Sequence, residues 1–175
     1  MGLEELAKLY RDAEKKMSED YIESLSLIQQ AMNLDNKLIF DSSIRMRNLK
    51  LSNGVSGLVE LNGRRVSINW NKMFIGGIFN YEVNLIIIPE KPTAAGIFEE
   101  CHHALQCALV RDINNSKVRM EVLTAYWVCR LFPESAEKKK EEIAFSYNVN
   151  LSPFLEEKEE TIKAYELFIN QDFLI

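Results

Sequence analysis

The most constraining feature of this sequence is a helical segment that is apolar on nearly every side. Residues 118–132 are mostly apolar, and Glu121 is the only acidic residue among them. A helix without a polar face belongs in the core of a protein. Pro133 follows directly and ends the helix, because proline lacks the backbone N–H that would continue it. The rest of the chain must therefore fold around this segment.

Apolar periodicity divides the remaining chain into helices and strands. Helical spacing over residues 3–32 predicts one long helix or two short ones. Short apolar runs predict three or four strands, at residues 38–40, 55–60, 65–70 and 83–88. Asn62 and Gly63 predict a type I′ hairpin between two of these strands, and the nearly continuous apolar run at 83–88 predicts a central strand. Further helices are expected over residues 92–110, 117–132, 135–147 and 153–169.

This order of elements predicts an α+β fold in a single domain that spans residues 1–175. A chain of 175 residues with 47% hydrophobic residues is long enough for one core. We expect an N-terminal helical segment, then a small three- to four-stranded sheet with a hairpin, then two helices, then further C-terminal helices. The corresponding boundaries are residues 1–33, 38–90, 92–133 and 134–175.

Charge and cysteine content exclude several classes of protein. The chain has 21 Lys+Arg against 26 Asp+Glu and a net charge of −5, which argues against the basic surface that nucleic-acid binding uses. It shows neither an apolar stretch of the ~20 residues that span a bilayer nor a signal peptide. We therefore expect a cytoplasmic protein that binds neither nucleic acid nor membrane. Three cysteines without C-x-x-C spacing predict buried free thiols, and the lysines at 138–140 predict a solvated helix face.

Both histidines of the protein lie in one helical turn beside two carboxylates. On a helical wheel, Glu99, His102, His103 and Gln106 fall on one side, with Glu100 at the edge of that group. An imidazole and a carboxylate one turn apart can bind the same divalent metal ion. The same residues also fit the solvated face of an amphipathic helix, and both interpretations stay open at this point.

Glu121 needs a partner wherever its helix lies in the core. A carboxylate in apolar surroundings must be paired, protonated or bound to a metal, because an isolated buried charge is too costly. An ion pair with Arg111, Arg119 or Arg130 would satisfy it. A metal site shared with His103 would satisfy it equally well.

The segment from Glu99 to His103 resembles the H-E-x-x-H helix of zincin-type metallopeptidases. Glu100 matches the catalytic glutamate and His103 the second histidine, whereas Glu99 stands where the first histidine would be. Glu121, followed by Thr124, resembles the third ligand of the gluzincin branch. The form E-E-x-x-H-x-x-Q, preceded by a strand and Pro-Thr, is also similar to uncharacterised zincin-like proteins of phages, mobile elements and bacterial toxin systems.

The resemblance implies a zinc-dependent peptidase that acts on a peptide or protein. Glu99, His103 and Glu121 would bind Zn²⁺, and Glu100 would be the general base toward the attacking water. His102 would orient the substrate or replace Glu99 as a ligand, and Gln106 is a further candidate for such a role.

Two alternatives stand beside this prediction. Glu99 in place of a neutral imidazole makes the site more negative, which weakens the ability of the metal to acidify water. The chain would then be a catalytically inactive zincin-like pseudo-enzyme that binds a protein partner. The Glu-x-x-His spacing also suggests a di-iron bundle, but such a bundle needs a second Glu-x-x-His, and the only two histidines share one turn.

Overall fold

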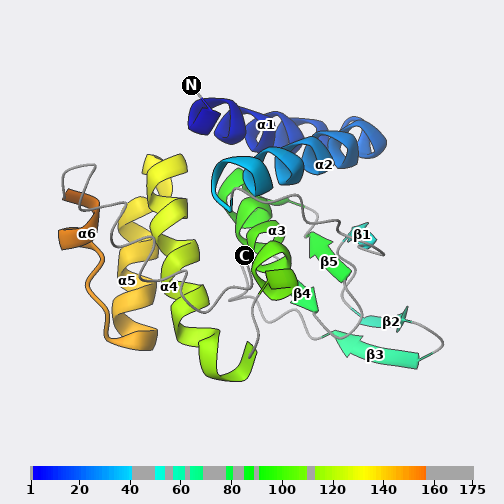
Figure 1. The fold of residues 1–175 in the computed structure, drawn as a ribbon. Helices are drawn as coiled ribbons and strands as arrows, with labels where there is room; N and C mark the ends of the chain where they lie inside the picture. Colours follow the sequence, from blue (N-terminus) through cyan, green and yellow to red (C-terminus); the bar gives the residue numbers. More distant parts are fainter. Residues whose placement is uncertain are drawn as a thin grey trace.

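The computed structural model describes residues 2–40, 50–53, 57–61, 64–68, 78–80, 85–88, 91–109 and 113–156. The helices are α1 (Gly2–Lys16), α2 (Tyr21–Leu38), α3 (Ala94–Leu109), α4 (Ile113–Leu131), α5 (Ala136–Tyr147) and α6 (Ser152–Glu156), with a short 3-10 helix at Pro133–Ser135. The strands are β1 (Lys50–Asn53), β2 (Gly57–Leu61), β3 (Arg64–Ile68), β4 (Ile78–Asn80) and β5 (Leu85–Ile88). Figure 1 shows α3 at the centre, between α4 on one side and the strands on the other, with α1 and α2 across one end.

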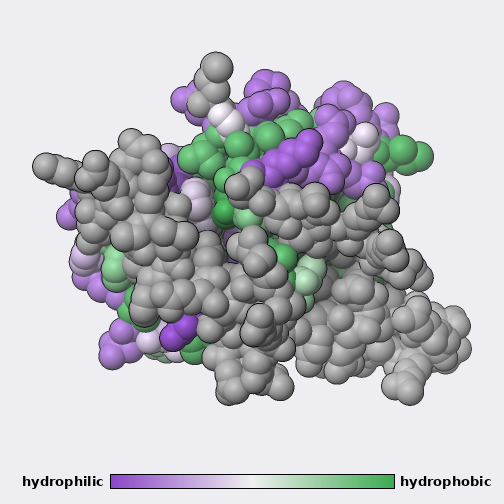
Figure 2. All heavy atoms as spheres, viewed as in Figure 1, coloured by the Kyte–Doolittle hydropathy of each residue, from purple (hydrophilic) through white to green (hydrophobic). Residues whose placement is uncertain are grey.

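The N-terminal periodicity produces two helices rather than one long helix. Asp20 begins α2, because its carboxylate accepts a hydrogen bond from the backbone N–H of Glu23 at 3.0 Å. The apolar stripe of α1 faces inward and buries Leu6, Tyr10 and Ala13 completely. Figure 2 shows hydrophilic side chains over much of the outer surface of this helix pair. The amphipathic pattern at residues 3–32 therefore predicts the inward face correctly.

The α+β fold class expected from the sequence is wrong, because helices rather than a sheet build this structure. The described residues are mostly helical. Among the residues whose burial is described, β5 is the only strand in the core, and helices supply nearly all the rest. The strands are short and lie in two separate groups, β1-β5-β4 and β2-β3. Such short runs cannot cover the apolar faces of these helices, so the helices bury those faces mainly against one another.

Local strand predictions fare better than the fold class. The strand β5 does lie between β1, which is parallel to it, and β4, which is antiparallel. The strands β2 and β3 pair antiparallel with Leu61 opposite Arg64, as the predicted two-residue turn requires; the turn residues themselves lie outside the described residues. The strand expected at 38–40 is wrong, because α2 continues to Leu38 and the N–H of Ile39 still bonds to Asp35.

The predicted core helix is confirmed as α4. Leu123, Tyr126 and Val128 are fully buried, and the helix ends immediately before Phe132 and Pro133. It begins at Ile113, earlier than the start at residue 117 that the sequence predicts. The sequence also predicts a last helix over residues 153–169. Only its first part is described, as α6, and residues 157–169 lie outside the described residues.

The cysteines are free thiols, and two of the three are buried as the sequence predicts. Cys101 and Cys129 are buried free thiols, and Cys107 is half-buried. Burial raises the pKa of Cys107 and of Cys129 to about 11, so both thiols stay protonated at neutral pH.

No helix in the part of the chain that the structure describes combines the length and the apolarity needed to cross a membrane.

Candidate metal centre

The start of α3 is fixed by two side-chain oxygens, which accept hydrogen bonds from backbone N–H groups of its first turn. The Thr93 hydroxyl accepts from the N–H of Gly96 at 3.0 Å, and the Glu14 carboxylate of α1 accepts from the N–H of Ala94 at 2.9 Å. A carboxylate is favoured at a helix N-terminus, where the helix dipole is positive. The helix that carries both histidines is thereby anchored to α1 at its first turn.

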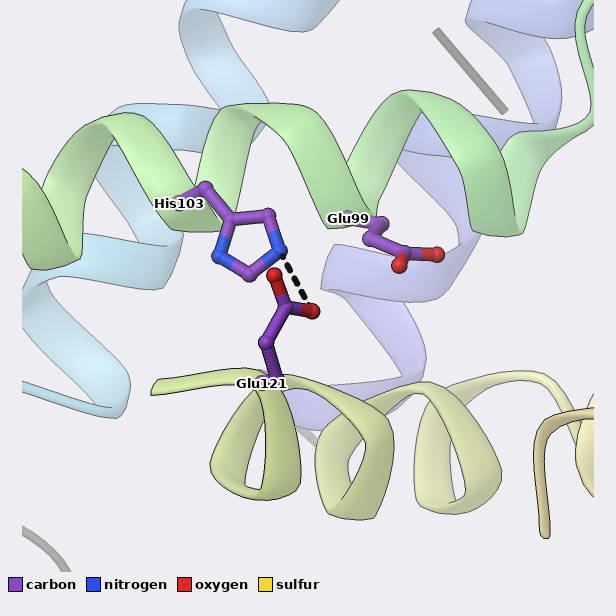
Figure 3. Close-up of side chains that lie close together, drawn as sticks. All are labelled: Glu99, His103 and Glu121. Carbon is purple, nitrogen blue, oxygen red and sulfur yellow. Dashed lines mark ion pairs between the residues drawn. The ribbon is translucent and has the colours of Figure 1, made fainter. Parts of the chain in front are cut away.

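Glu99, His103 and Glu121 come together between α3 and α4. One ligand atom of each lies within 4.8 Å of the others (Figure 3). Glu99 and His103 are one turn apart on α3 and share a face, and α4 packs alongside with Glu121 turned toward them. The Nε2 atom of His103 is 3.3 Å from Oε2 of Glu121. This group could hold a metal ion.

The electrostatics of the group favour a cation. The side chains of Glu99, His103 and Glu121 are only 21%, 13% and 28% exposed. Burial opposes the charged imidazole, but the hydrogen bond and charge of Glu121, assisted by Glu100 and Glu99, outweigh it and raise the pKa of His103 to about 9. Burial likewise opposes the charged carboxylate of Glu121, yet His103 and nearby lysines lower its pKa. Positive charge is thus stabilised at this position.

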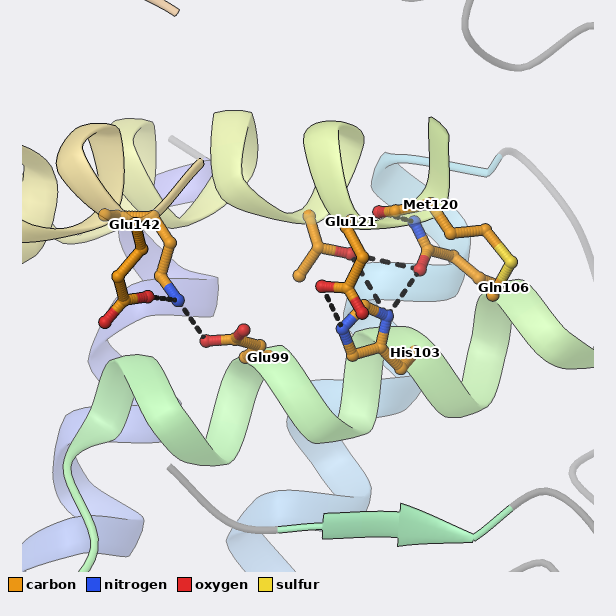
Figure 4. Close-up of polar contacts among 8 residues, drawn as sticks. Glu99, His103, Gln106, Met120, Glu121 and Glu142 are labelled. Atoms are coloured by element: carbon orange, nitrogen blue, oxygen red, sulfur yellow. Dashed lines mark hydrogen bonds and ion pairs between the residues drawn. The ribbon is translucent and has the colours of Figure 1, made fainter. Parts of the chain in front are cut away.

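Lys139 of α5 also reaches the group and was not foreseen. Its Nζ lies 2.8 Å from Oε2 of Glu99 and 2.7 Å from Oε2 of Glu142, two carboxylates that Figure 4 shows side by side. The side chain of Lys139 is 14% exposed. Burial lowers the pKa of Lys139, but the charge of Glu99 and hydrogen bonds to Glu142 and Glu99 outweigh it and raise that pKa. The expectation of a solvated face at 138–140 is wrong for this residue. Lys139 lies one turn before the buried Ile143, a spacing that marks the inner face of α5.

Gln106 lies within the packing between α3 and α4 rather than facing a substrate. Its side chain is fully buried, and its Oε1 is 2.9 Å from Nδ1 of His103 and 3.0 Å from the Thr124 hydroxyl. Its Nε2 donates to the backbone carbonyl of Met120 at 3.1 Å. The Gln106 side chain therefore joins His103 on α3 to the backbone of α4.

His102 points away from the group into the core. Its Nδ1 is 2.8 Å from Oδ2 of Asp35 in α2, and both side chains are fully buried. Its ring lies against Phe40 and Phe98, each with a centroid separation of 5.0 Å. Successive residues of a helix diverge by ~100°, so His102 and His103 cannot serve one site.

The role of Asp35 was missed, although the sequence carries a signal for it. Asp35 follows Ile28 and Met32 at helical spacing and therefore continues the inward stripe of α2. An acid at such a position requires a buried partner. His102 is that partner, at the crossing of α2 with α3.

Glu100, the predicted general base, is adjacent to the group but outside the three side chains that cluster. Its side chain is half-buried, and its charge helps to raise the pKa of His103. Its catalytic role stays a prediction.

Comparison with protein-family models, curated proteins and solved structures gives no match for this chain. The function of the chain is therefore inferred from the geometry of its described residues.

Substituting Lys139 should strengthen metal binding. In Lys139→Met, Glu99 loses the ammonium that competes with a metal ion, so we expect affinity for a divalent cation to rise roughly tenfold, about 1.4 kcal/mol. This free energy corresponds to one hydrogen bond between charged groups, reduced because the Lys139–Glu99 pair is partly exposed to solvent. Competition against a chelator measures the change. Lys138→Met, at the exposed neighbouring position, is the matched control, and equal affinity in both variants would contradict the competition.

Proposed function

We propose that Glu99, His103 and Glu121 bind Zn²⁺ and that the chain is a zinc-dependent peptidase of zincin type. The observation that carries the proposal is the convergence of these three side chains from two helices to within 4.8 Å. Three protein ligands are the usual number at a catalytic zinc site, where the fourth position stays open for water or substrate. The distances and the partial exposure of the group support such an open site.

The chemistry of the donors fits zinc better than the other common biological cations. One imidazole nitrogen with two carboxylate oxygens is a mixed nitrogen and oxygen set of the kind that binds Zn²⁺. Ca²⁺ and Mg²⁺ prefer more ligands, all of them oxygen. The contact between Nδ1 of His103 and Oε1 of Gln106 supports the same assignment. Zinc-binding histidines usually form a hydrogen bond through their second ring nitrogen to a neighbouring acceptor.

The residues of the chain would divide the reaction among them. When bound, Zn²⁺ would supply the Lewis acid that polarises a peptide carbonyl and acidifies water. Glu100 would accept a proton from the water as its oxygen attacks the carbonyl carbon. The same carboxyl group would then give the proton to the amine as the C–N bond breaks. Glu99, His103 and Glu121 would keep their positions throughout.

A catalytically inactive, protein-binding relative is the second candidate, and Lys139 favours it. The ammonium 2.8 Å from Glu99 gives the carboxylates a counter-charge from within the chain. A group neutralised in this way can persist without a metal ion. The scaffold would then serve for binding a protein partner.

Metal content and hydrolysis together test the proposal. The tag-free protein is incubated with Zn²⁺, and unbound zinc is removed. Its metal content is then measured, and the protein is incubated with a diverse peptide library. We expect near-stoichiometric zinc and cleavage, with Glu100→Gln retaining zinc and losing cleavage by roughly 10²–10⁴-fold, the usual contribution of a general base.

Each step of this experiment has a result that counts against the proposal. If the wild-type protein holds no zinc after loading, the proposal of a zinc-dependent peptidase is wrong, and the protein-binding candidate is favoured. Zinc binding with equal cleavage by wild type and Glu100→Gln would keep the metal site and remove Glu100 from the mechanism.

A further inference from the structure

The carboxamide of Gln106 is fixed in one orientation by its surroundings. Its Nε2 lies 3.1 Å from the carbonyl oxygen of Met120, which can only accept a hydrogen bond. Rotating the amide by 180° would set two oxygens against each other in a fully buried position. Oε1 must therefore face His103 and Thr124 (Figure 4).

This orientation decides which nitrogen of His103 carries a proton. Oε1 of Gln106 lies 2.9 Å from Nδ1, and an oxygen that only accepts requires a donor at that distance. The Thr124 hydroxyl, 3.5 Å from Nδ1, donates to the same Oε1 at 3.0 Å. Nδ1 therefore carries a proton. The Glu121 carboxylate also accepts, at 3.3 Å from Nε2, so each ring nitrogen faces an acceptor, and the contact to Gln106 is the shorter of the two. When the ring is neutral, we expect its one proton on Nδ1, which leaves the lone pair on Nε2.

We infer that Gln106, supported by Thr124, is a positioning residue that selects the Nδ1–H tautomer of His103 and so presents Nε2 to the metal ion. The inference rests on the proposed function for its metal, but the tautomer itself is a property of the metal-free protein. The same bonds tie His103 of α3 to the helical turn of α4 that carries Glu121, since Met120 and Thr124 lie on either side of it. One buried side chain therefore sets both the protonation and the position of the imidazole.

Nitrogen NMR of the histidine rings tests the inference without metal. The protein contains only two histidines, so selective labelling with nitrogen-15 gives two ring spectra. They are recorded at a pH above the pKa of His103. We expect His103 of the wild type to be in the Nδ1–H form and Gln106→Met to shift it toward the Nε2–H form. His102, which contacts Asp35 instead, is an internal control and should not change.

Zinc affinity measured by chelator competition is the second readout. Loss of a residue that orients a metal-binding histidine costs 10- to 100-fold in affinity, and we expect that loss in Gln106→Met. Thr124→Val, which keeps the shape of the side chain, should shift both readouts in the same direction by less. Gln106→Glu should retain the Nδ1–H form, because a carboxylate accepts from Nδ1–H at least as well. Gln30→Met, at an exposed position of α2, should change neither readout.

The outcomes separate this inference from the proposed function. A wild-type ring in the Nε2–H form, held by Glu121, overturns the inference. So does an Nδ1–H ring that persists in both Gln106→Met and Thr124→Val. A loss of zinc affinity without a change of tautomer would mean a merely structural role and overturns it as well. A wild-type protein that binds no zinc overturns the proposed function. The tautomer comparison in the metal-free protein still decides the role of Gln106 in that case.

Discussion

Replacing Asp35 by leucine should lower the free energy of unfolding by about 1–3 kcal/mol, the cost of leaving a buried polar group without its hydrogen-bond partner. Asp35 and His102 are both fully buried, with Oδ2 and Nδ1 2.8 Å apart. Leucine has nearly the shape of aspartate, so the substitution leaves little cavity. The cost comes from an imidazole left without its acceptor between Phe40 and Phe98.

Urea unfolding followed by circular dichroism measures this effect. The double variant Asp35→Leu with His102→Leu should be more stable than the single variant, because apolar replacement of both partners removes the unpaired polar group. Asp12→Leu is the matched control, since Asp12 pairs with Lys8 at the surface of α1, and we expect no measurable change there. A single variant as stable as the wild type would show that the pair does not hold α2 against α3.

Replacing Glu121 by glutamine should reduce zinc affinity by at least roughly 100-fold, more than the loss of an orienting residue alone. The change preserves shape but removes the charge that lies 3.3 Å from His103. Zinc that binds only the folded state stabilises it, by about 2.7 kcal/mol at 100 times the dissociation constant. Wild-type protein should therefore unfold at higher temperature with zinc, and Glu121→Gln should not.

Two variants support the interpretation of this experiment. His103→Ala should lose the zinc-dependent stabilisation in the same way, because it removes the nitrogen ligand. Glu137→Gln changes an exposed glutamate of α5 that pairs with Lys140, and it should keep the full stabilisation. Equal stabilisation of wild type and Glu121→Gln by zinc would place the metal elsewhere.

The local elements follow from the sequence where one physical signal dominates. The apolar run of α4, the periodicity of α1 and the antiparallel pairing of β2 with β3 each reflect the chemistry of neighbouring residues. The strand expected at residues 38–40 failed because α2 continues through Leu38, which places Asp35 in the helix opposite His102. The fold class failed for a related reason. The strands β2, β3 and β5 lie where the sequence predicts strands, whereas β1 and β4 were not predicted, and the share of all strands in the core depends on how the helices pack.

The sequence by itself brought Glu99 and His103 onto one face of a helix, because their spacing is that of one helical turn. It also indicated that Glu121 needs a charged or metal partner, because its helix is otherwise apolar. Only the tertiary structure decided that His102 turns to Asp35, that Gln106 bonds to His103, and that Lys139 reaches Glu99. The contacts of His102 with Asp35 and of Lys139 with Glu99 join residues far apart in the chain. The orientation of Gln106 toward His103 is fixed by the backbone carbonyl of Met120 in α4. Their physical basis is the packing of whole helices, which no local pattern of residues contains.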